Sequence, residues 1–371
     1  MRAKAGFRYD RGTRTNGVRV PTALKLKLAP QRRFEAIDVN RRIAVEAGDV
    51  LHRYRRALYC SFHTTAGYLD QSLSARMHHR QDLLSQFFRA FHVLFPQGGE
   101  YHHDRMELRS ELSEEQKIVE PRNGDSHLTY IGSGMRNCVT YRARPDAPVY
   151  FIELDGLTDA MARQRTTKIV AYDQERVIAR SSVGVAVSRH PVDSINLADP
   201  RLGLLDAVNE LLARTGLQYG RVDLVVDPTE RNVGLTVNEY ETLLMQNDLA
   251  DVLRDPLRFA RLKAKNALID PLSIPGKTLN YAKYDVVRVL NSLMEALRLD
   301  QSSFERLVAK VMSLPARRFL RSRRVSFLAA ADVDEGRPQL LRGTYQSPIL
   351  VQWQSAARQE RRIDIMLSEL S

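Results

Sequence analysis

The sequence has 371 residues, of which 43% are hydrophobic and 27% are charged, and this indicates two domains of ordinary globular composition. Its two cysteines exclude a disulfide framework or a cysteine-rich zinc site, and no apolar run approaches the roughly 20 residues of a membrane span, so we expect a cytoplasmic protein with no membrane partner. The net charge of +12 favours an anionic partner, either a phosphorylated metabolite or nucleic acid, although a basic surface kept for solubility also explains it.

Residues 1–32 are basic and show little periodicity, so we predict a mostly irregular arm that is either solvated or in contact with nucleic acid. Beyond it, alternation predicts a strand over residues 34–39, and a second strand over 58–62 delivers His63 at its end. Apolar residues at helical spacing predict a helix over 78–95. Four more strands are predicted between turn signals, over residues 128–131, 139–141, 149–152 and 167–171.

A polar run near residues 172–175 marks the end of the first unit, and we place the two domains at residues 33–178 and 179–371. The second domain is predicted to carry a helical insert over about residues 250–323. Its other elements are a helix over 206–212 and strands over 183–187, 222–226, 325–328, 340–344, 349–353 and 363–366. The prediction is an α+β protein of two tandem domains, each with a mostly antiparallel sheet.

Three short polar motifs carry the candidate chemistry: His63-Thr64-Thr65-Ala66, Tyr101-His102-His103-Asp104 and Ser126-His127. The imidazoles of His63, His103 and His127 suit Zn²⁺ with a fourth position open, where the metal activates water or holds a phosphate oxygen. Asp104, or alternatively Asp125, is then the carboxylate that fixes a histidine tautomer. The alternative is three separate hydrogen-bonded histidines, and His102 competes with His103 for the middle place.

Several further residues are candidates for holding a bound anion. The hydroxyls of Thr64 and Thr65 follow a strand, and Gly132-Ser133-Gly134 offers backbone N–H groups that can approach a phosphate. The guanidinium groups of Arg136, Arg163 and Arg165 add charge. The alternatives are ordinary turn residues and surface arginines.

In this order, the three motifs resemble those of the YjbQ-like family, also called secondary thiamine-phosphate synthase, across roughly residues 33–172. The second half resembles other parts of the same family pattern, at residues 236–239, Asp248, residues 343–346 and residues 361–363. The resemblance implies a reaction in which a thiazole phosphate displaces pyrophosphate from a pyrimidine diphosphate. It also implies a homo-oligomer, commonly a trimer.

The two halves keep different parts of the family pattern. Gln71-Ser72 stand where the family has Asn-Glu, and these residues recur as Asn238-Glu239 in the second half, which lacks the histidine motifs. Either the halves complement one another across an interface or the second is a degenerate scaffold, and the sequence leaves both open.

These features predict a metal-dependent enzyme that acts on a small phosphorylated substrate, as a thiamine-phosphate synthase-like transferase or a phosphohydrolase. The alternative is a non-catalytic anion- or nucleic-acid-binding protein that uses the basic arm and the arginine run at residues 317–324.

Overall fold

The computed structural model describes residues 8–9, 14–15, 18–144, 147–157, 162–254, 259, 262, 320, 322–331 and 336–371, and side chains from residue 19 onward except that of Val93. Every pair of strands in this described part is antiparallel, which confirms the predicted fold class. None of the described helices is both long and apolar enough to cross a membrane.

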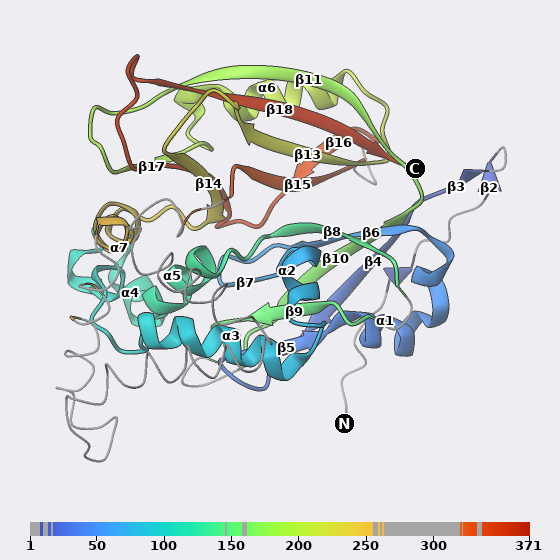
Figure 1. The fold of residues 1–371 in the computed structure, drawn as a ribbon, viewed down its shortest axis with the longest axis horizontal. Helices are drawn as coiled ribbons and strands as arrows, with labels where there is room; N and C mark the ends of the chain where they lie inside the picture. The colour runs from blue at the N-terminus through green and yellow to red at the C-terminus, as the bar shows by residue number, and fades with distance from the viewer. Residues whose placement is uncertain are drawn as a thin grey trace, which may run out of the picture.

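The first half is built on a five-stranded sheet and a three-stranded sheet (Figure 1). In spatial order, the larger sheet contains β1 (Arg8–Tyr9), β4 (Thr22–Leu28), β10 (Arg165–Tyr172), β6 (Arg56–Ser61) and β8 (Cys138–Arg142). The smaller sheet contains β5 (Glu35–Asp38), β9 (Tyr150–Glu153) and β7 (Ala66–Gly67), and a separate two-stranded ribbon contains β2 (Arg14–Thr15) and β3 (Val18–Arg19).

Strand β4 corrects the predicted irregular arm, because Thr22–Leu28 lies between β1 and β10 in the larger sheet. Leu24, Leu26 and Leu28 are buried, and the lysines between them point away and are exposed. This is the period-two pattern of a half-buried strand. The basic composition of the first 32 residues concealed it.

The helices of the first half lie partly on its outer side and partly toward the second half (Figure 1). They are α1 (Val39–Ala47), η1 (Gly48–Arg53), α2 (Gln71–Arg76), α3 (Gln81–Leu94), η2 (His102–Asp104), η3 (Met106–Leu108), α4 (Glu114–Val119) and α5 (Gly124–Ser133). Helix α5 corrects the strand predicted over 128–131, since a short apolar run fits a buried helix as well as a strand. Gly134, with φ of 76°, ends this helix in the left-handed conformation.

The second half has a five-stranded and a three-stranded sheet of its own. The larger contains, in spatial order, β11 (Glu175–Ala186), β18 (Glu360–Leu370), β13 (Tyr219–Val226), β15 (Arg324–Ala331) and β16 (Pro338–Leu341); the smaller contains β12 (Asp193–Asn196), β17 (Ser347–Gln352) and β14 (Val233–Asn238). The helices are η4 (Pro200–Leu202), α6 (Leu204–Ala213), η5 (Leu243–Asp248) and α7 (Leu249–Arg254). Helix α7 lies where the predicted insert begins, and most of the rest of that insert is outside the described residues.

The two halves share one topology, and we call them unit one (residues 22–172) and unit two (residues 175–371). The order β4-β10-β6-β8 recurs as β11-β18-β13-β15, and β5-β9-β7 recurs as β12-β17-β14. The match extends to single residues. Gly67 pairs with Ile152 and Gly234 with Val351, and a Cβ on either glycine would lie within 3.0 Å of a backbone oxygen of the strand or loop beside it.

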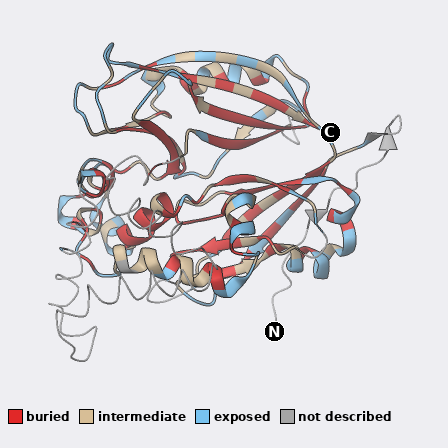
Figure 2. Ribbon diagram, in the orientation of Figure 1, coloured by how far each residue is buried: buried red, intermediate tan, exposed pale blue. Residues whose placement is uncertain are grey.

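The two larger sheets face one another and bury a shared core (Figure 2). Apolar residues of β4, β6, β8 and β10 meet residues of β13, β15 and β18 there, including Leu58, Val170, Leu328, Ala330 and Leu370. A second shared core joins α3 and α5 to η5 and α7. Both cores fix the position of unit two against the segments of unit one that carry the histidines.

Candidate active site at the junction of the two units

Two of the predicted histidines lie side by side where the units meet. His103 comes from η2 and His127 from α5, and their ring centroids are 5.0 Å apart with the rings nearly perpendicular. Both side chains are only 1% exposed. The residues of unit two that contact the two rings most closely are Asn238, at the end of β14, and Glu241, just after this strand.

Asn238 determines which nitrogen of His127 carries hydrogen. Its Oδ1 accepts a hydrogen bond from the backbone N–H of Glu239 at 2.8 Å, and its Nδ2 donates to the carbonyl oxygen of Thr64 at 3.2 Å, so the amide has one orientation. The same Oδ1 lies 2.6 Å from His127 Nδ1, which therefore donates. His127 Nε2 is left with its lone pair, 3.9 Å from Glu239 Oε2.

His103 has acceptors at both ring nitrogens. Nδ1 lies 3.1 Å from Glu241 Oε2, and Nε2 lies 3.1 Å from Asn123 Oδ1. The Asn123 amide is oriented because its Nδ2 donates to Asp155 at 2.7 Å. Since neither acceptor can donate, both nitrogens of His103 carry hydrogen and the ring is an imidazolium. A guanidinium nitrogen of Arg109 lies farther from Nδ1, at 3.4 Å.

The two neighbouring imidazoles therefore differ in charge, and their pKa directions agree with the hydrogen bonds. Burial lowers the pKa of His103, but its hydrogen bond to Glu241 and the charge of Asp104 outweigh burial and leave this pKa raised. Burial, together with the charge of His103, holds the pKa of His127 well below its ordinary value. Burial also raises the pKa of Glu239. A charged and a neutral imidazole thus lie in contact.

Asp248 of unit two anchors the turn that carries His103. Its carboxylate accepts hydrogen bonds from the backbone N–H groups of His102 and His103, at 3.1 and 3.0 Å, and it is fully buried. Its Oδ1 also lies 3.2 Å from the His102 ring. His102 thus faces a different carboxylate from His103, which separates the two members of the doublet.

His63 is held by a different set of contacts. Its Nε2 accepts a hydrogen bond from the backbone N–H of Thr166 at 2.8 Å, and burial followed by the charge of Arg165 lowers its pKa to about 4. Gln346 of unit two donates to the carbonyl oxygens of Ser61 and His63, at 3.0 and 2.9 Å. A side chain of unit two thus holds the backbone at His63 and two residues before it, at Ser61.

The three histidines do not present the expected zinc site in this arrangement. Both nitrogens of His103 are engaged with acceptors, and Nε2 of His63 accepts from Thr166, so the contacts of the described residues leave a free lone pair at His127 Nε2 alone. Within the described ranges, no group of three or more His, Cys, Asp or Glu side chains is placed to hold a metal ion. The carboxylate of Asp104, which we predicted to fix a histidine tautomer, accepts a hydrogen bond from the backbone N–H of Gly124.

The predicted anion-binding residues divide into two groups. Thr64 and Thr65 lie at the junction, where the Thr64 carbonyl contacts Asn238 and the Thr65 hydroxyl accepts from Arg165 at 3.3 Å. Ser133 and Gly134 instead end helix α5, and Arg136 pairs with Asp70 at 2.9 Å. A helix C-terminus presents carbonyl oxygens, which disfavour an anion. The triplet Gly132-Ser133-Gly134 therefore does not serve as the predicted phosphate-binding nest.

The sequence did not single out the polar residues that support His103. Asp155 is their centre: it accepts from Asn123, and it pairs with Arg163 at 2.5 Å and Arg33 at 3.3 Å. Arg163 Nε is buried and has no hydrogen-bond partner among the described residues. Asn123 and Asp155 each precede a glycine, so their sequence signal is that of a turn.

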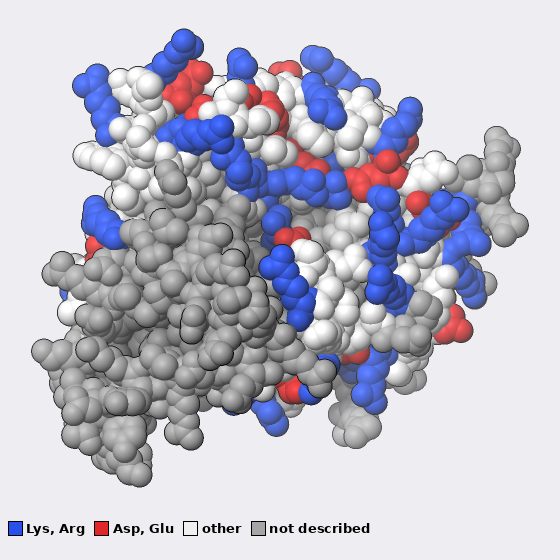
Figure 3. Space-filling model, viewed as in Figure 1, with Lys and Arg blue, Asp and Glu red and all other residues white. Residues whose placement is uncertain are grey.

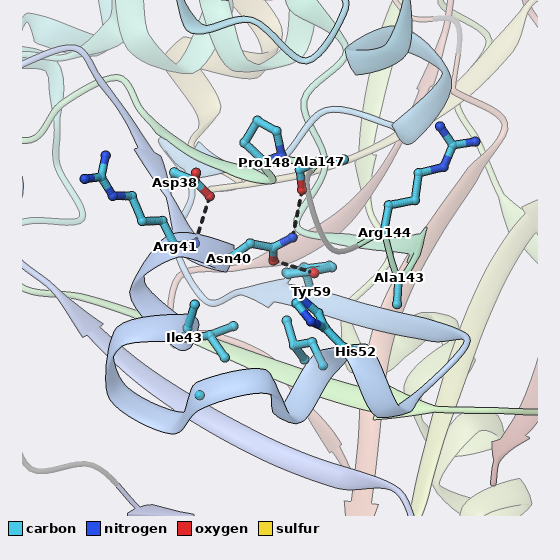
Figure 4. Close-up of a pocket in the computed structure, with 13 residues that line it drawn as sticks. Asp38, Asn40, Arg41, Ile43, His52, Tyr59, Ala143, Arg144, Ala147 and Pro148 are labelled. Atoms are coloured by element: carbon cyan, nitrogen blue, oxygen red, sulfur yellow. Dashed lines mark hydrogen bonds between the residues drawn. The ribbon is translucent and has the colours of Figure 1, made fainter.

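Two further features of the molecule are the charge on its surface and a cavity beside helix α1. Figure 3 shows Lys and Arg side chains along the boundary between the units, with Asp and Glu among them. A cavity of about 270 Å³ lies beside helix α1, lined in part by Asp38 and His52. Figure 4 shows Arg41 and Arg144 on opposite sides of it, with Asn40 and Tyr59 between them. No residue predicted for the histidine site lines this cavity.

Comparisons with known proteins found no matching family model and no matching curated protein. Among solved structures, a YbjQ-like protein of unknown function from Sulfolobus solfataricus has 16% identity and a TM-score of 0.27, covering 53% of this chain and 99% of its own. A hypothetical protein from Aeropyrum pernix has 17% identity and a TM-score of 0.25, covering 51% and 96%. A YjbQ/UPF0047 family protein from Clostridium acetobutylicum has 12% identity and a TM-score of 0.25, covering 51% and 98%. Each of these YjbQ-like and hypothetical proteins aligns with about half of this chain, and the likeness concerns the fold alone.

Proposed function

We propose that this chain is an enzyme that acts on a small phosphorylated substrate by proton transfer at the junction of its two units. The observation that carries the proposal is the free Nε2 of His127, which is oriented by Asn238 and faces Glu239 at 3.9 Å. That separation is too long for a direct hydrogen bond. It suits an oxygen atom of a bound substrate or water lying between the two groups.

The proposed chemical step is attack of an oxygen nucleophile on phosphorus. His127 Nε2 takes the proton of the nucleophile, the bond from phosphorus to the leaving oxygen breaks, and the electron pair leaves with that oxygen. The positive charge of His103, 5.0 Å from His127 between ring centroids, stabilises the negative charge that develops. With a diphosphate ester as substrate, attack on the terminal phosphorus releases a phosphate monoester anion, which needs no proton.

Recognition of a phosphate group is supported by an unused cationic donor. Arg163 Nε is buried without a partner among the described residues, and the charge of Arg163 acts on both His63 and His127. An unmatched buried N–H of a guanidinium is costly unless an acceptor fills the place. A phosphate oxygen would supply that acceptor, in keeping with the net charge of +12.

We also propose that unit two is a degenerate copy of unit one. The shared strand order and the paired glycines Gly67 and Gly234 support this, and so does the division of motifs between the halves. Counting four residues on from each glycine makes Gln71 the equivalent of Asn238. Gln71 accepts from the backbone N–H of Arg142 within its own unit, whereas Asn238 serves a histidine of the other unit.

The experiment is a turnover screen of the purified chain. A pyrimidine diphosphate offered with a thiazole phosphate would be tested separately for release of pyrophosphate, because that reaction breaks a bond between carbon and oxygen. Phosphate monoesters and diphosphate esters would be tested for release of phosphate by attack on phosphorus. We expect His127→Gln to lower the rate about 10²–10⁴-fold, because it removes the proton acceptor. Asn238→Ala should lower it about 10²-fold, because the ring loses the group that fixes its tautomer.

The matched control is His52→Gln, a histidine in the separate cavity, which should leave the rate unchanged. Full activity of His127→Gln would contradict the proposal, and so would a wild-type chain that turns over nothing in the screen. The predicted zinc is tested apart from this, by metal analysis of the wild type and His63→Ala. Stoichiometric metal in the wild type that disappears in the variant would support the predicted metal site.

A further inference from the structure

The two cysteines lie at directly opposite positions on neighbouring strands. Cys60 of β6 pairs with Cys138 of β8, and their Sγ atoms are 2.7 Å apart as free thiols. Both side chains are buried, with 2% and 3% exposure. The sequence separates them by 78 residues, so the fold alone makes them neighbours.

The register of these strands brings the two side chains as close as antiparallel pairing allows. The backbone N–H of Ser61 bonds the carbonyl oxygen of Asn137 at 2.7 Å, so Ser61 and Asn137 form a hydrogen-bonded pair. The adjacent pair, Cys60 with Cys138, is therefore of the non-hydrogen-bonded type, with Cα atoms about 4.5 Å apart. Disulfides span Cα separations of about 4.4–6.8 Å, so a bond fits here at the short end of the range.

The surroundings of the pair determine when it can react. Both cysteines belong to the apolar core between the units, beside Leu328 and Ala330 of unit two. Burial, followed by the neighbouring Cys138, raises the pKa of the Cys60 thiol well above its ordinary value, so thiolate is scarce. Because the sulfurs are buried in this core, a reagent in solution reaches them only through local opening of the fold.

We propose that Cys60 and Cys138 form a redox modification site that closes into an intramolecular disulfide on reaction with a low-molecular-weight disulfide. One cysteine thiolate attacks a sulfur of the reagent and expels one small thiolate, leaving a mixed disulfide. The other cysteine attacks the protein sulfur of that mixed disulfide and expels the second. The two protein thiols lose two electrons and two protons, and the reagent is reduced to two thiols.

The position of this bond links it to the junction site. Strand β6 leads directly into the segment that carries His63, and β8 follows helix α5, which carries His127. The loop that the disulfide closes contains all three predicted histidines. Oxidation thus restrains the half of the site that unit one supplies.

The test is an equilibrium measurement on the full chain in buffers of reduced and oxidised glutathione, brought to the same end point from the reduced and the oxidised side. Samples are quenched with a thiol-alkylating reagent, and the intact mass distinguishes the closed form, two hydrogens lighter, from the dithiol and the glutathione adducts. We expect the effective concentration of one thiol toward the other to be about 100-fold higher in the folded chain than in concentrated urea. A peptide linking residues 60 and 138 identifies the bond.

Cys60→Ser and Cys138→Ser are the matched variants, and each should give only the glutathione adduct. An effective concentration in the folded chain equal to or below that in urea would overturn the proposal. A disulfide that joins two chains instead of closing within one would overturn it as well. Neither result bears on phosphate chemistry at the junction, so this inference is independent of the proposed function.

Discussion

At the scale of single residues, the junction site depends on polar side chains that act as acceptors in fixed directions. Asn238 and Asn123 each have an amide oriented by a second hydrogen bond, and each presents its oxygen to a histidine. The ring of His127 meets a single acceptor and stays neutral, whereas the ring of His103 meets two acceptors and is charged. The difference between His127 and His103 therefore comes from their neighbours and not from the rings.

The ion pair of His103 with Glu241 should be important for folding. Both side chains are nearly fully buried and 3.1 Å apart, and breaking one partner of a buried pair typically costs about 3–5 kcal/mol. We expect Glu241→Gln to lower the free energy of unfolding, measured in urea, by a few kcal/mol on this scale. Glu114→Gln is the control, because Glu114 forms an exposed pair with Lys117 and should change it by less than about 1 kcal/mol. Equal effects of the two substitutions would contradict the assignment of a charged His103.

How much of the site the sequence could predict differs from residue to residue. His103 and His127 lie in short polar motifs, so their types and order were sufficient to select them. Glu241 and Asp155 carry no such pattern. Their roles follow from contacts between segments 138 and 32 residues apart, which only the fold creates.

At the scale of elements, the prediction was right for long patterned segments and wrong where the pattern was short or masked by charge. Helix α3 lies within the predicted 78–95, and β13 contains the predicted 222–226. The lysines of β4 led to the prediction of an irregular arm where a strand forms, and the short run Leu128–Ile131 of α5 led to the prediction of a strand where a helix forms. Burial on both sides makes the short segment ambiguous, because period then carries no information.

The loop between β16 and β17 should tolerate no side chain at Gly343. A Cβ there would lie 1.9 Å from the carbonyl oxygen of Phe62. The backbone on either side of Phe62 is held in place, because Gln346 donates to the carbonyl oxygens of Ser61 and His63. We expect Gly343→Ala to lower the thermal midpoint markedly, by displacing this loop from β6. Gly216→Ala is the matched control, since nothing lies within 4 Å of its Cβ and it should be neutral. Equal midpoints for the two variants would show that the loop does not clamp β6.

Helix α3 should make the protein sensitive to acid through His92. Its ring packs edge-on against Phe34 at 5.3 Å, and burial, followed by the charge of Arg33, lowers its pKa to about 4. Between the ordinary pKa near 6.5 and about 4, the unfolded chain binds a proton that the folded chain does not, so stability falls as pH decreases through this range. The loss reaches about 3 kcal/mol when the range is crossed completely.

Urea unfolding at neutral and acidic pH checks this effect. The wild type should lose more stability on acidification than His92→Gln, whose side chain stays neutral throughout. His190→Gln, at an exposed position, should behave as the wild type does. An identical acid response of wild type and His92→Gln would contradict a buried neutral imidazole in α3.

At the scale of the whole molecule, the two units are alike in topology and unlike in what they contribute. Unit one supplies the histidines, and unit two supplies Asn238, Glu241 and Asp248 to hold them. The sequence left open whether the halves complement one another or the second is a scaffold. These contacts between the units are those expected of complementary halves. Gln71, which lies four residues after Gly67 as Asn238 lies four residues after Gly234, bonds within its own unit.

Asn238 of unit two thus sets the tautomer of His127 in unit one. Nitrogen NMR of the imidazole rings tests this, because it reports the protonation of each ring nitrogen in wild type, Asn238→Ala and the control Asn196→Ala. We predict that His127 is neutral with hydrogen on Nδ1 in the wild type and in the control, and that Asn238→Ala abolishes this preference. Hydrogen on Nε2 of His127 in the wild type, or an unchanged tautomer in Asn238→Ala, would contradict the account.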